Sequence, residues 1–247
     1  MIRKVKRQIN RVTASIALLS VEVGIILVLF IVSLFIFLYL ARRVFVLRDN
    51  TFDQRVFDLL TPYVTDTTTS AMKFFTFLGA HEFLIPANLV LIAYFLFIHK
   101  HRWYSIKIPA IALSSLALMF LLKNSFGRTR PLIPLLEGIS GLSFPSGHAL
   151  MSVTFYGLMG FIVWQTVRRK LLKWGICLVF LLLIVFIGFS RIYFRVHYAS
   201  DVIAGYCMGL LWLVISIALM QRIENYSRRE VDLDADNRDA TNLPKDV

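Results

Sequence analysis

The chain has 247 residues, of which 57% are hydrophobic and 17% charged, and its mean hydropathy is +0.69. A water-soluble domain of this composition would be hard to keep in solution, so the sequence indicates an integral membrane protein and excludes a disordered chain, a collagen and a disulfide scaffold. Cys177 and Cys207 lie inside apolar runs, as small buried side chains do. Lys and Arg outnumber Asp and Glu by 27 to 15, which leaves nucleic acid, anionic lipid and a phosphate-bearing substrate open as partners.

The chain begins with a basic segment and a long apolar run. Five of the first eleven residues are Lys or Arg and none is acidic, and residues 23–41 are apolar. This run is too long for the apolar core of a signal peptide, and no small-residue cleavage motif follows it. We therefore expect residues 1–22 to be a basic cytoplasmic N-terminus and residues 23–41 to be an uncleaved first transmembrane helix.

Five more apolar stretches are long enough to cross a membrane. They comprise residues 83–98, 108–122, 149–167, 171–189 and 202–220. A helix of about 20 residues crosses a hydrocarbon core of about 30 Å. The predicted fold class is therefore all-α, a polytopic bundle of six transmembrane helices that occupies residues 23–220.

The segment between the first two spans has a different pattern. Val56, Leu59, Leu60 and Tyr63 recur at helical spacing amid charged residues. The charged residues among them are Asp53, Arg55 and Asp58. This pattern predicts an amphipathic helix that lies in the membrane interface, within about residues 50–80.

Orientation follows from the basic residues of the short connections. Two alternate loops are basic, as is the N-terminus, and basic loops mark the cytoplasmic side. These loops hold Lys100, Arg102 and Lys107, then Arg168, Arg169, Lys170 and Lys173. Both termini are thus predicted to be cytoplasmic, with residues 221–247 a polar, disordered tail, although Arg42 and Arg43 on the opposite side weaken the rule. Because the basic residues edge apolar helices, no nucleic-acid signature is present.

Polar and ionisable residues also gather in the loops predicted to lie on the outer side. They form three groups, each at a helix end, and the predicted topology brings all three to one face. The groups are Lys123 with Arg130 and Pro131, then Pro145, Ser146, Gly147 and His148, and finally Ser190, Arg191, His197 and Asp201.

These residue types suit phosphate chemistry. Lys123, Arg130 and Arg191 can neutralise a phosphoryl group, and an Arg fork binds two of its oxygens at once. Ser146 and Gly147 precede a helix, so the free N–H groups of its first turn form an anion site that glycine lets a ligand approach closely. The expected ligand is therefore a phosphate ester.

The two histidines suit nucleophilic and acid–base roles. His197 and Asp201 are four residues apart, and on one helix face the carboxylate would accept from one ring nitrogen and leave the other with a free lone pair. This arrangement is a nucleophile with an orienting partner. His148 could protonate the leaving oxygen and later take a proton from water.

Other interpretations are open for the same residues. Taken singly, an Arg near a helix end most often lies at the membrane interface, and a Ser-Gly pair before a helix is usually a helix cap. However, so many charged residues on one face near a membrane are energetically costly unless they have a function. A metal-dependent hydrolase would need more carboxylates, and Glu137 is the only other one near these motifs on the outer face. A non-catalytic lipid-binding or transport protein would be expected to lack the nucleophile. Phosphotransfer to an acceptor other than water stays open.

With these motifs the sequence resembles the type 2 phosphatidic acid phosphatase superfamily. The family is marked by Lys, six residues and Arg-Pro; then by Pro-Ser-Gly-His; then by Ser-Arg, five residues, His, three residues and Asp. Every one of these positions is matched by the three groups given above. The resemblance covers about residues 107–220, and the six-helix layout extends it more loosely to the N-terminus.

The resemblance implies a six-helix membrane phosphatase, with a core similar to that of vanadium-dependent haloperoxidases, that needs no metal or other cofactor and acts through a phosphohistidine. It makes His197 the nucleophile, Asp201 its orienting partner and His148 the general acid and then base. The remaining positions, Lys123, Arg130, Ser146, Gly147, Ser190 and Arg191, would bind the substrate phosphate. The resemblance alone leaves the substrate open, since glucose-6-phosphatase, a member of the family, acts on a sugar phosphate. Because the site is expected at the outer mouth of a membrane bundle, the expected partner is a lipid phosphate or diphosphate in the cell membrane, met on the outer side. Phosphatidic acid, phosphatidylglycerol phosphate, undecaprenyl pyrophosphate and lipid A are all substrates within the family.

Overall fold

The computed structural model describes residues 23–136, 138 and 140–241, and for residues 229–241 the course of the backbone only. The described part is helical and contains no strand, which confirms the all-α prediction. Six helices are long and apolar enough to cross a membrane, as predicted. They are Val23–Val46, His81–Ile98, Arg102–Phe126, Gly147–Thr166, Lys170–Tyr193 and Ala199–Arg228. The predicted basic segment 1–22 lies outside the described residues.

The helices differ from the predicted ranges mainly in extending beyond them. Helix α5 (Arg102–Phe126) begins before the apolar stretch 108–122 and ends after it. Helix α8 (Ala199–Thr241) continues far past residue 220, where a disordered tail was predicted. Hydropathy marks only the part of a helix that suits hydrocarbon, and polar residues continue a helix where pairs four residues apart support it. Glu224 and Arg228 form such a pair, at 2.8 Å.

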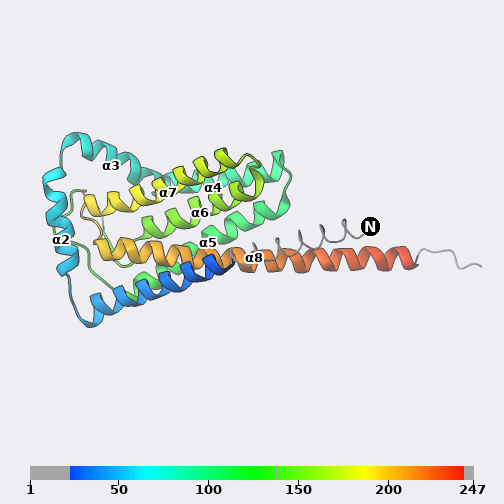
Figure 1. The fold of residues 1–247 in the computed structure, drawn as a ribbon, viewed down its shortest axis with the longest axis horizontal. Helices are drawn as coiled ribbons and strands as arrows, with labels where there is room; N and C mark the ends of the chain where they lie inside the picture. The colour runs from blue at the N-terminus through cyan, green and yellow to red at the C-terminus, as the bar shows by residue number, and fades with distance from the viewer. Residues whose placement is uncertain (1–22, 137, 139, 242–247) are drawn as a thin grey trace, which may run out of the picture.

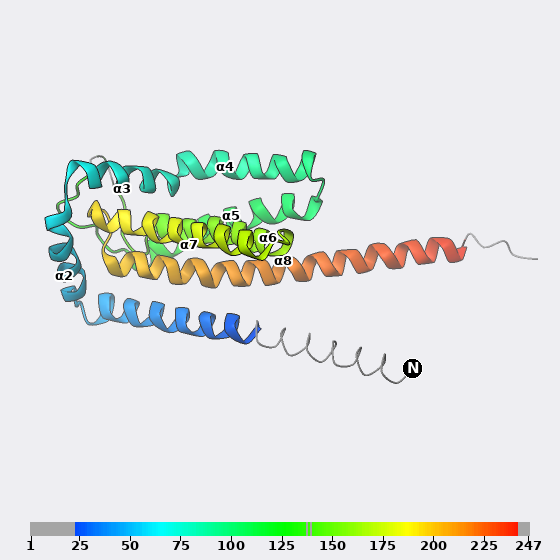
Figure 2. The same cartoon turned by 45° about the horizontal axis from the view of Figure 1, so that its top comes forward.

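Figures 1 and 2 show the spans running side by side, with α2 (Thr51–Leu60) lying across one end of the bundle. A short turn leads from α2 into α3 (Asp66–Leu78), which runs back toward α4 (His81–Ala93) and packs on α7 (Lys170–Tyr193). A capping box at its N-terminus, between Thr65 and Thr68, defines where α3 starts. Together α2 and α3 enclose the end of the bundle at which the predicted site residues lie.

The amphipathic segment is helical as predicted, and only part of it is buried against the bundle. Asp53 and Phe57 are the buried residues of α2, whereas Leu59 and Tyr63 are 70% and 67% exposed. Lipid tails are as apolar as leucine, so an apolar stripe on a membrane protein does not show which face touches protein. The expectation that this segment lies in the membrane interface remains a prediction.

The starts of α6 (Gly147–Thr166) and α8 are held close together by two glycines. A Cβ atom at Gly205 would lie 2.7 Å from the Ser146 carbonyl oxygen, and one at Gly209 would lie 2.9 Å from that of Leu150. No larger residue fits there without moving a backbone. The contact brings the first turn of α8 against the first turn of α6, and the Ser146 N–H donates to the Asp201 carbonyl at 3.0 Å.

The opposite end of the bundle is joined by a buried ion pair. Lys107 of α5 donates to Glu224 of α8 at 2.5 Å, and both side chains are largely buried. Because Glu224 also accepts from Arg228, its two oxygens are both bonded. This pair fixes how α5 and α8 align far from the predicted site.

Candidate active site

All nine predicted site residues lie at the end of the bundle that α2 covers. Lys123 is in the last turn of α5, and Arg130 is in the long loop between α5 and α6. Ser146, Gly147 and His148 start α6; Ser190 and Arg191 end α7; His197 and Asp201 flank the start of α8. The loops therefore bring together groups that are up to 78 residues apart in sequence.

His197 does not lie on the same helix as Asp201, contrary to the expectation. It precedes the first residue of α8, in a tight turn where Arg195 has a φ of 51°. The two side chains still meet, because the Asp201 carboxylate turns back to accept the Tyr198 N–H at 2.9 Å, and its Oδ2 lies 3.6 Å from His197 Nδ1. The predicted pairing is thus made through a helix start instead of a helix face.

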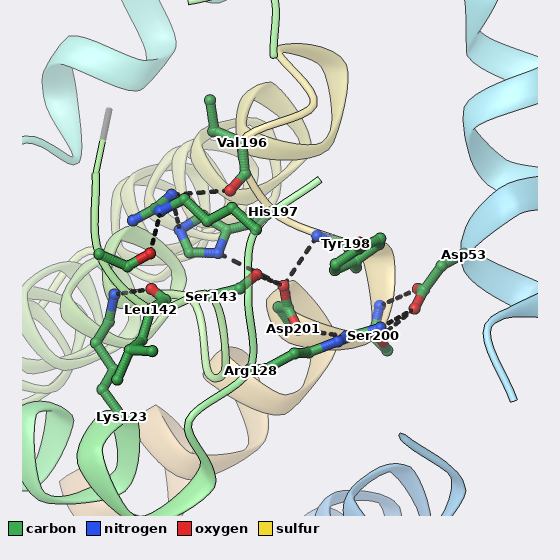
Figure 3. A network of polar contacts seen from close by, with 12 residues as sticks. Asp53, Lys123, Arg128, Leu142, Ser143, Val196, His197, Tyr198, Ser200 and Asp201 are labelled. Atoms are coloured by element: carbon green, nitrogen blue, oxygen red, sulfur yellow. Dashed lines mark hydrogen bonds and ion pairs between the residues drawn. The ribbon is translucent and has the colours of Figure 1, made fainter. Parts of the chain in front are cut away.

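The two ring nitrogens of His197 have different neighbours. Nδ1 faces Asp201, and Nε2 lies 3.4 Å from Nη1 of Arg130 (Figure 3). Burial, with the nearby guanidinium groups of Arg130 and Arg191, lowers the pKa of His197 to about 4, against the opposing effect of Asp201. The imidazole is therefore neutral near pH 7, and one nitrogen carries a lone pair.

Three cations, Lys123, Arg130 and Arg191, lie in the site with this histidine, and backbone carbonyls hold the first two. Lys123 donates to the Leu142 carbonyl at 2.9 Å, and Arg130 donates to the carbonyls of Gly141 and Val196 at 3.1 and 2.8 Å (Figure 3). Burial lowers the pKa of Arg130 from its ordinary value. Backbone carbonyls thus fix the positions of two cations and leave further N–H groups free for an anion.

The start of α6 is shaped to approach Lys123 closely. A Cβ atom at Gly147 would meet the sulfur of Met119 at 2.5 Å and would lie 3.9 Å from Cε of Lys123. Glycine therefore allows the N-terminus of α6 to sit beside the ammonium group, as the sequence predicted for an anion site.

Helix α3 contributes to the site as well. Arg191 donates through Nη1 to the Thr76 hydroxyl at 2.5 Å. A Cβ atom at Gly79 would lie 3.3 Å from Cδ2 of His148. The segment between the first two spans therefore contacts Arg191 directly and leaves, at Gly79, no room for a side chain beside His148.

Among the described residues, four buried side-chain atoms have no hydrogen-bond partner, and three of them belong to this site. These are Ser146 Oγ, Arg191 Nε and His197 Nδ1; the fourth is Nδ1 of His101. His197 Nδ1 faces the Asp201 carboxylate at 3.6 Å, so Ser146 Oγ and Arg191 Nε are the two site atoms whose bonding a polar ligand would complete. Ser190 differs, because its hydroxyl donates to the Ile187 carbonyl of its own helix.

Behind His197 lies a buried network that the sequence did not reveal. Arg128 donates to Asp201 at 2.5 Å and to Asp53 at 2.8 Å, and its guanidinium stacks over the Tyr198 ring at 3.9 Å (Figure 3). Ser143 donates to the second oxygen of Asp201. Arg128 could have been noticed in the sequence, because it is a basic residue two positions before Arg130. Nothing in the residue pattern of α2 indicated that Asp53 is buried. Glu137, the other carboxylate considered, lies outside the described residues.

Comparison with known proteins places this geometry in a family. Residues 104–224 match the PAP2 superfamily. The phosphatidylglycerophosphatase B of Bacillus subtilis (strain 168) is 28% identical over 155 residues, which are 62% of this chain and 76% of that protein.

Two solved structures are also similar. A transmembrane PAP2-type phosphatidylglycerolphosphate phosphatase from Bacillus subtilis superimposes with a TM-score of 0.72 at 24% identity, over 78% of this chain and 96% of that one. The Aquifex aeolicus LpxE structure gives a TM-score of 0.50 at 29% identity, over 67% and 94%. The family match, the shared fold and the complete three-part signature around His197 show that the chain belongs to the PAP2 superfamily.

Proposed function

We propose that this membrane phosphatase removes the phosphate of a lipid phosphate by transferring it first to His197 and then to water, without a metal ion. The observation that carries the proposal is the environment of His197: a neutral imidazole held between a carboxylate and a guanidinium, within a ring of cations. A neutral histidine with an orienting partner is the form that acts as a nucleophile.

In the first step the histidine attacks the phosphorus atom. With the Nδ1 proton directed at Asp201, Nε2 carries the lone pair and lies on the side of Arg130. The N–P bond forms as the bond to the lipid oxygen breaks, and that oxygen keeps the electron pair and takes a proton from His148. The imidazolium left on His197 is stabilised by Asp201.

In the second step water attacks the phosphohistidine. His148 takes the water proton, the N–P bond breaks with its electron pair returning to Nε2, and inorganic phosphate leaves. Throughout, Lys123, Arg130 and Arg191 neutralise the charge on the phosphoryl oxygens, and the start of α6 donates its free N–H groups.

The metal-dependent alternative is disfavoured by what the carboxylates already bind. Asp201 accepts from Arg128, Ser143 and the Tyr198 N–H, and Asp53 accepts from Arg128 and twice from Ser200. Little lone-pair capacity is left on either for a cation. The site is richer in cations than in free acids, which suits a phosphate and not a divalent metal ion.

The substrate class follows from the surroundings of the site. Leu132 and Ile133, which follow Arg130 and Pro131 in the sequence, are 96% and 71% exposed. Exposed apolar side chains beside a cationic pocket favour a ligand with its phosphate at headgroup depth and its tails in hydrocarbon. Because the curated relative is named a phosphatidylglycerophosphatase, phosphatidylglycerol phosphate is the first candidate, and a polyprenyl diphosphate is the second.

The location proposed is the cell membrane, with both termini cytoplasmic and the site on the outer side. The basic loops at the far end of the bundle support this orientation. Ile133→Cys, in a protein lacking Cys177 and Cys207, should react with an impermeant maleimide added outside intact cells. Labelling from the cytoplasmic side only would reverse the orientation.

The test of the function is phosphate release by the purified protein in detergent. The substrates are phosphatidylglycerol phosphate, phosphatidic acid, undecaprenyl pyrophosphate and glucose 6-phosphate, each with and without EDTA, with His197→Ala as the blank. The proposal predicts that a lipid phosphate is the best substrate and that EDTA has no effect. Loss of activity in EDTA that Mg²⁺ or Zn²⁺ restores would support a metal enzyme, and a preference for the sugar phosphate would contradict the lipid assignment.

Phosphotransfer is tested in the same assay by adding a lipid or sugar alcohol as acceptor. Hydrolysis predicts that free phosphate accounts for all the substrate consumed. A phosphorylated acceptor formed in place of phosphate would make the protein a transferase.

A further inference from the structure

We propose that Asp53, in α2, is a positioning residue of this phosphatase, which holds the Asp201 carboxylate against His197 through Arg128. The inference rests on the proposed function, because it concerns how the nucleophile of that reaction is oriented. It also gives the segment between the first two spans a part in the reaction.

Both carboxylate oxygens of Asp201 are bonded. Its Oδ2 atom, the one facing His197, also accepts from the Ser143 hydroxyl and the Tyr198 N–H. The other oxygen, Oδ1, is bonded to Arg128. The direction of the guanidinium therefore sets the plane of the carboxylate and, with it, the angle at which Oδ2 meets the imidazole.

The Arg128 guanidinium is held by hydrogen bonds on both of its terminal nitrogens. Its Nη2 atom donates to Asp53 at 2.8 Å, while Nη1 is shared between Asp201 and Ser200 (Figure 3). Nη2 also donates to the Asn50 side chain at 2.9 Å. The donors on one side of the fork thus point at α2 and those on the other side at the start of α8. Because the guanidinium is planar and rigid, fixing one side orients the other.

Asp53 is itself fixed from two directions. It is 1% exposed, and besides Arg128 it accepts from the backbone N–H and the hydroxyl of Ser200, at 2.8 and 2.7 Å. Ser200 is in the first turn of α8, next to Asp201. The carboxylate therefore caps α8 and anchors the guanidinium at once, which joins α2 to the helix start that carries Asp201.

Charge gives a second reason for this role. Asp53 and Asp201 carry two negative charges around one guanidinium, so the buried group has one net negative charge beside His197. A buried charged triad is seldom more stable than an apolar replacement of the same volume, so stability alone does not account for it. Its net charge favours the positive charge that His197 gains when it binds the phosphoryl group.

The test compares Asp53→Asn with Asp58→Asn, which changes an exposed carboxylate on the same helix. For Asp53→Asn we expect kcat to fall by about 10- to 100-fold, with an unchanged KM, an unchanged inhibition constant for inorganic phosphate and a similar melting temperature. Asp58→Asn should behave as wild type. A purely structural role predicts a lower melting temperature, with kcat per folded molecule unchanged.

The sharper measurement is a double-mutant cycle with Asp201→Asn. If Asp53 acts through Asp201, adding Asp53→Asn to Asp201→Asn lowers kcat by less than about threefold further. Full additivity of the two losses would overturn the inference. Wild-type kcat in Asp53→Asn, with His197→Ala inactive, would overturn it too while leaving the proposed function intact.

A second variant keeps the inference testable if Asp53→Asn does not fold. Ser200→Ala retains all three charges and removes the hydroxyl that lies between Asp53, Arg128 and Asp201. It should lower kcat about tenfold, because the hydroxyl accepts from the Arg128 guanidinium and donates to the Asp53 carboxylate, and hydrogen bonds to charged groups are the stronger ones. It should have no such effect in the Asp201→Asn background. Unchanged kcat, or an equal effect in both backgrounds, would contradict the chain of contacts from Asp53 to His197.

Discussion

Two buried ion pairs hold α8 at opposite ends of the bundle, and they differ in what surrounds them. At the far end, Lys107 and Glu224 bond to each other, and Arg228 bonds to the remaining oxygen of Glu224. At the site end, the pair of Arg128 and Asp201 lies beside buried polar atoms that have no partner among the described residues. Both ends contain buried charge, but of the four buried atoms without a partner among the described residues, three lie at the site end and one, His101 Nδ1, lies near the far-end pair.

This difference separates structural polar groups from functional ones. A buried pair whose bonds are all made holds helices in register, whereas a cluster with unbonded donors around a neutral histidine is ready to bind an anion. His101, the remaining buried residue with an unpartnered atom, has aromatic neighbours such as Tyr104, 4.3 Å between ring centroids, and no cation cluster of this kind. If the two ends have these separate roles, substitutions at the site end should lower kcat, and substitutions at the far end should lower stability.

The largest effect is expected from His197→Ala. Removing the nucleophile should lower kcat by on the order of 10⁵- to 10⁶-fold, leaving only binding and electrostatics. The melting temperature should change little, because the ring faces the site. Phosphate release at a few per cent of the wild-type rate would mean that another group attacks the phosphorus.

Asp201→Asn should come next, with kcat lowered by about 10³- to 10⁴-fold. The amide has nearly the same shape, but it no longer selects the His197 tautomer that leaves Nε2 unprotonated. Turnover and thermal unfolding should be measured together. A loss below about tenfold would show that the 3.6 Å contact with His197 does not matter for turnover.

His148→Ala should have an effect that depends on the leaving group. A lipid monoester expels an alkoxide, which needs the proton, so its hydrolysis should fall about 10²- to 10⁴-fold. The first step on an aryl phosphate or a diphosphate should be much less affected. Single-turnover rates on the three classes distinguish these cases, and equal losses on all of them would argue against His148 as the general acid.

Activity should be insensitive to the ionisation of His197 over most of the acid range. Its pKa is lowered to about 4, so the nucleophile is neutral above that pH and becomes protonated below it. After correction for the ionisation of an aryl phosphate substrate, kcat/KM should therefore hold from pH 7 to 5 and halve near pH 4. A half-point near pH 6.5 would show that burial does not depress this pKa.

The far-end ion pair should affect stability and not catalysis. Lys107→Met leaves Glu224 partly buried with only Arg228, and should lower the free energy of unfolding by on the order of 3 kcal/mol. The double variant Lys107→Met with Glu224→Leu should recover most of that loss. In both variants, kcat per folded molecule should equal that of the wild type. A large decrease in kcat would show that the far-end ion pair also affects catalysis.

The sequence predicts the fold and most of the site for a physical reason. A long apolar run in a bilayer can hardly form anything but a transmembrane helix, so the six spans follow from the hydropathy of the sequence. The charged residues at three helix ends are expected outside the hydrocarbon, and the alternation of the spans puts them on the same side of the membrane. Lys123, Arg130 and His197 were predicted in this way to meet at one end of the bundle, which is where the structure has them.

What the sequence could not show depends on how distant segments dock. Asp53 and Arg128 are 75 residues apart, and the spacing around Asp53 resembles that of any polar helix face. The turn that places His197 outside α8 requires a positive φ at Arg195, and this cannot be predicted from the residue type. The length of α8 beyond residue 220 was missed because hydropathy marks the hydrocarbon layer and not where a helix ends.

The most direct test of the central claim is to trap the covalent intermediate. A substrate with a ³²P-labelled phosphoryl group is mixed with enzyme and quenched in alkali within one turnover, and the labelled peptide is sequenced by mass spectrometry. The account predicts an acid-labile phosphoryl group on His197, which builds up further in His148→Ala when an aryl phosphate is used. Label on any other residue, or none at any time while product forms, would contradict it.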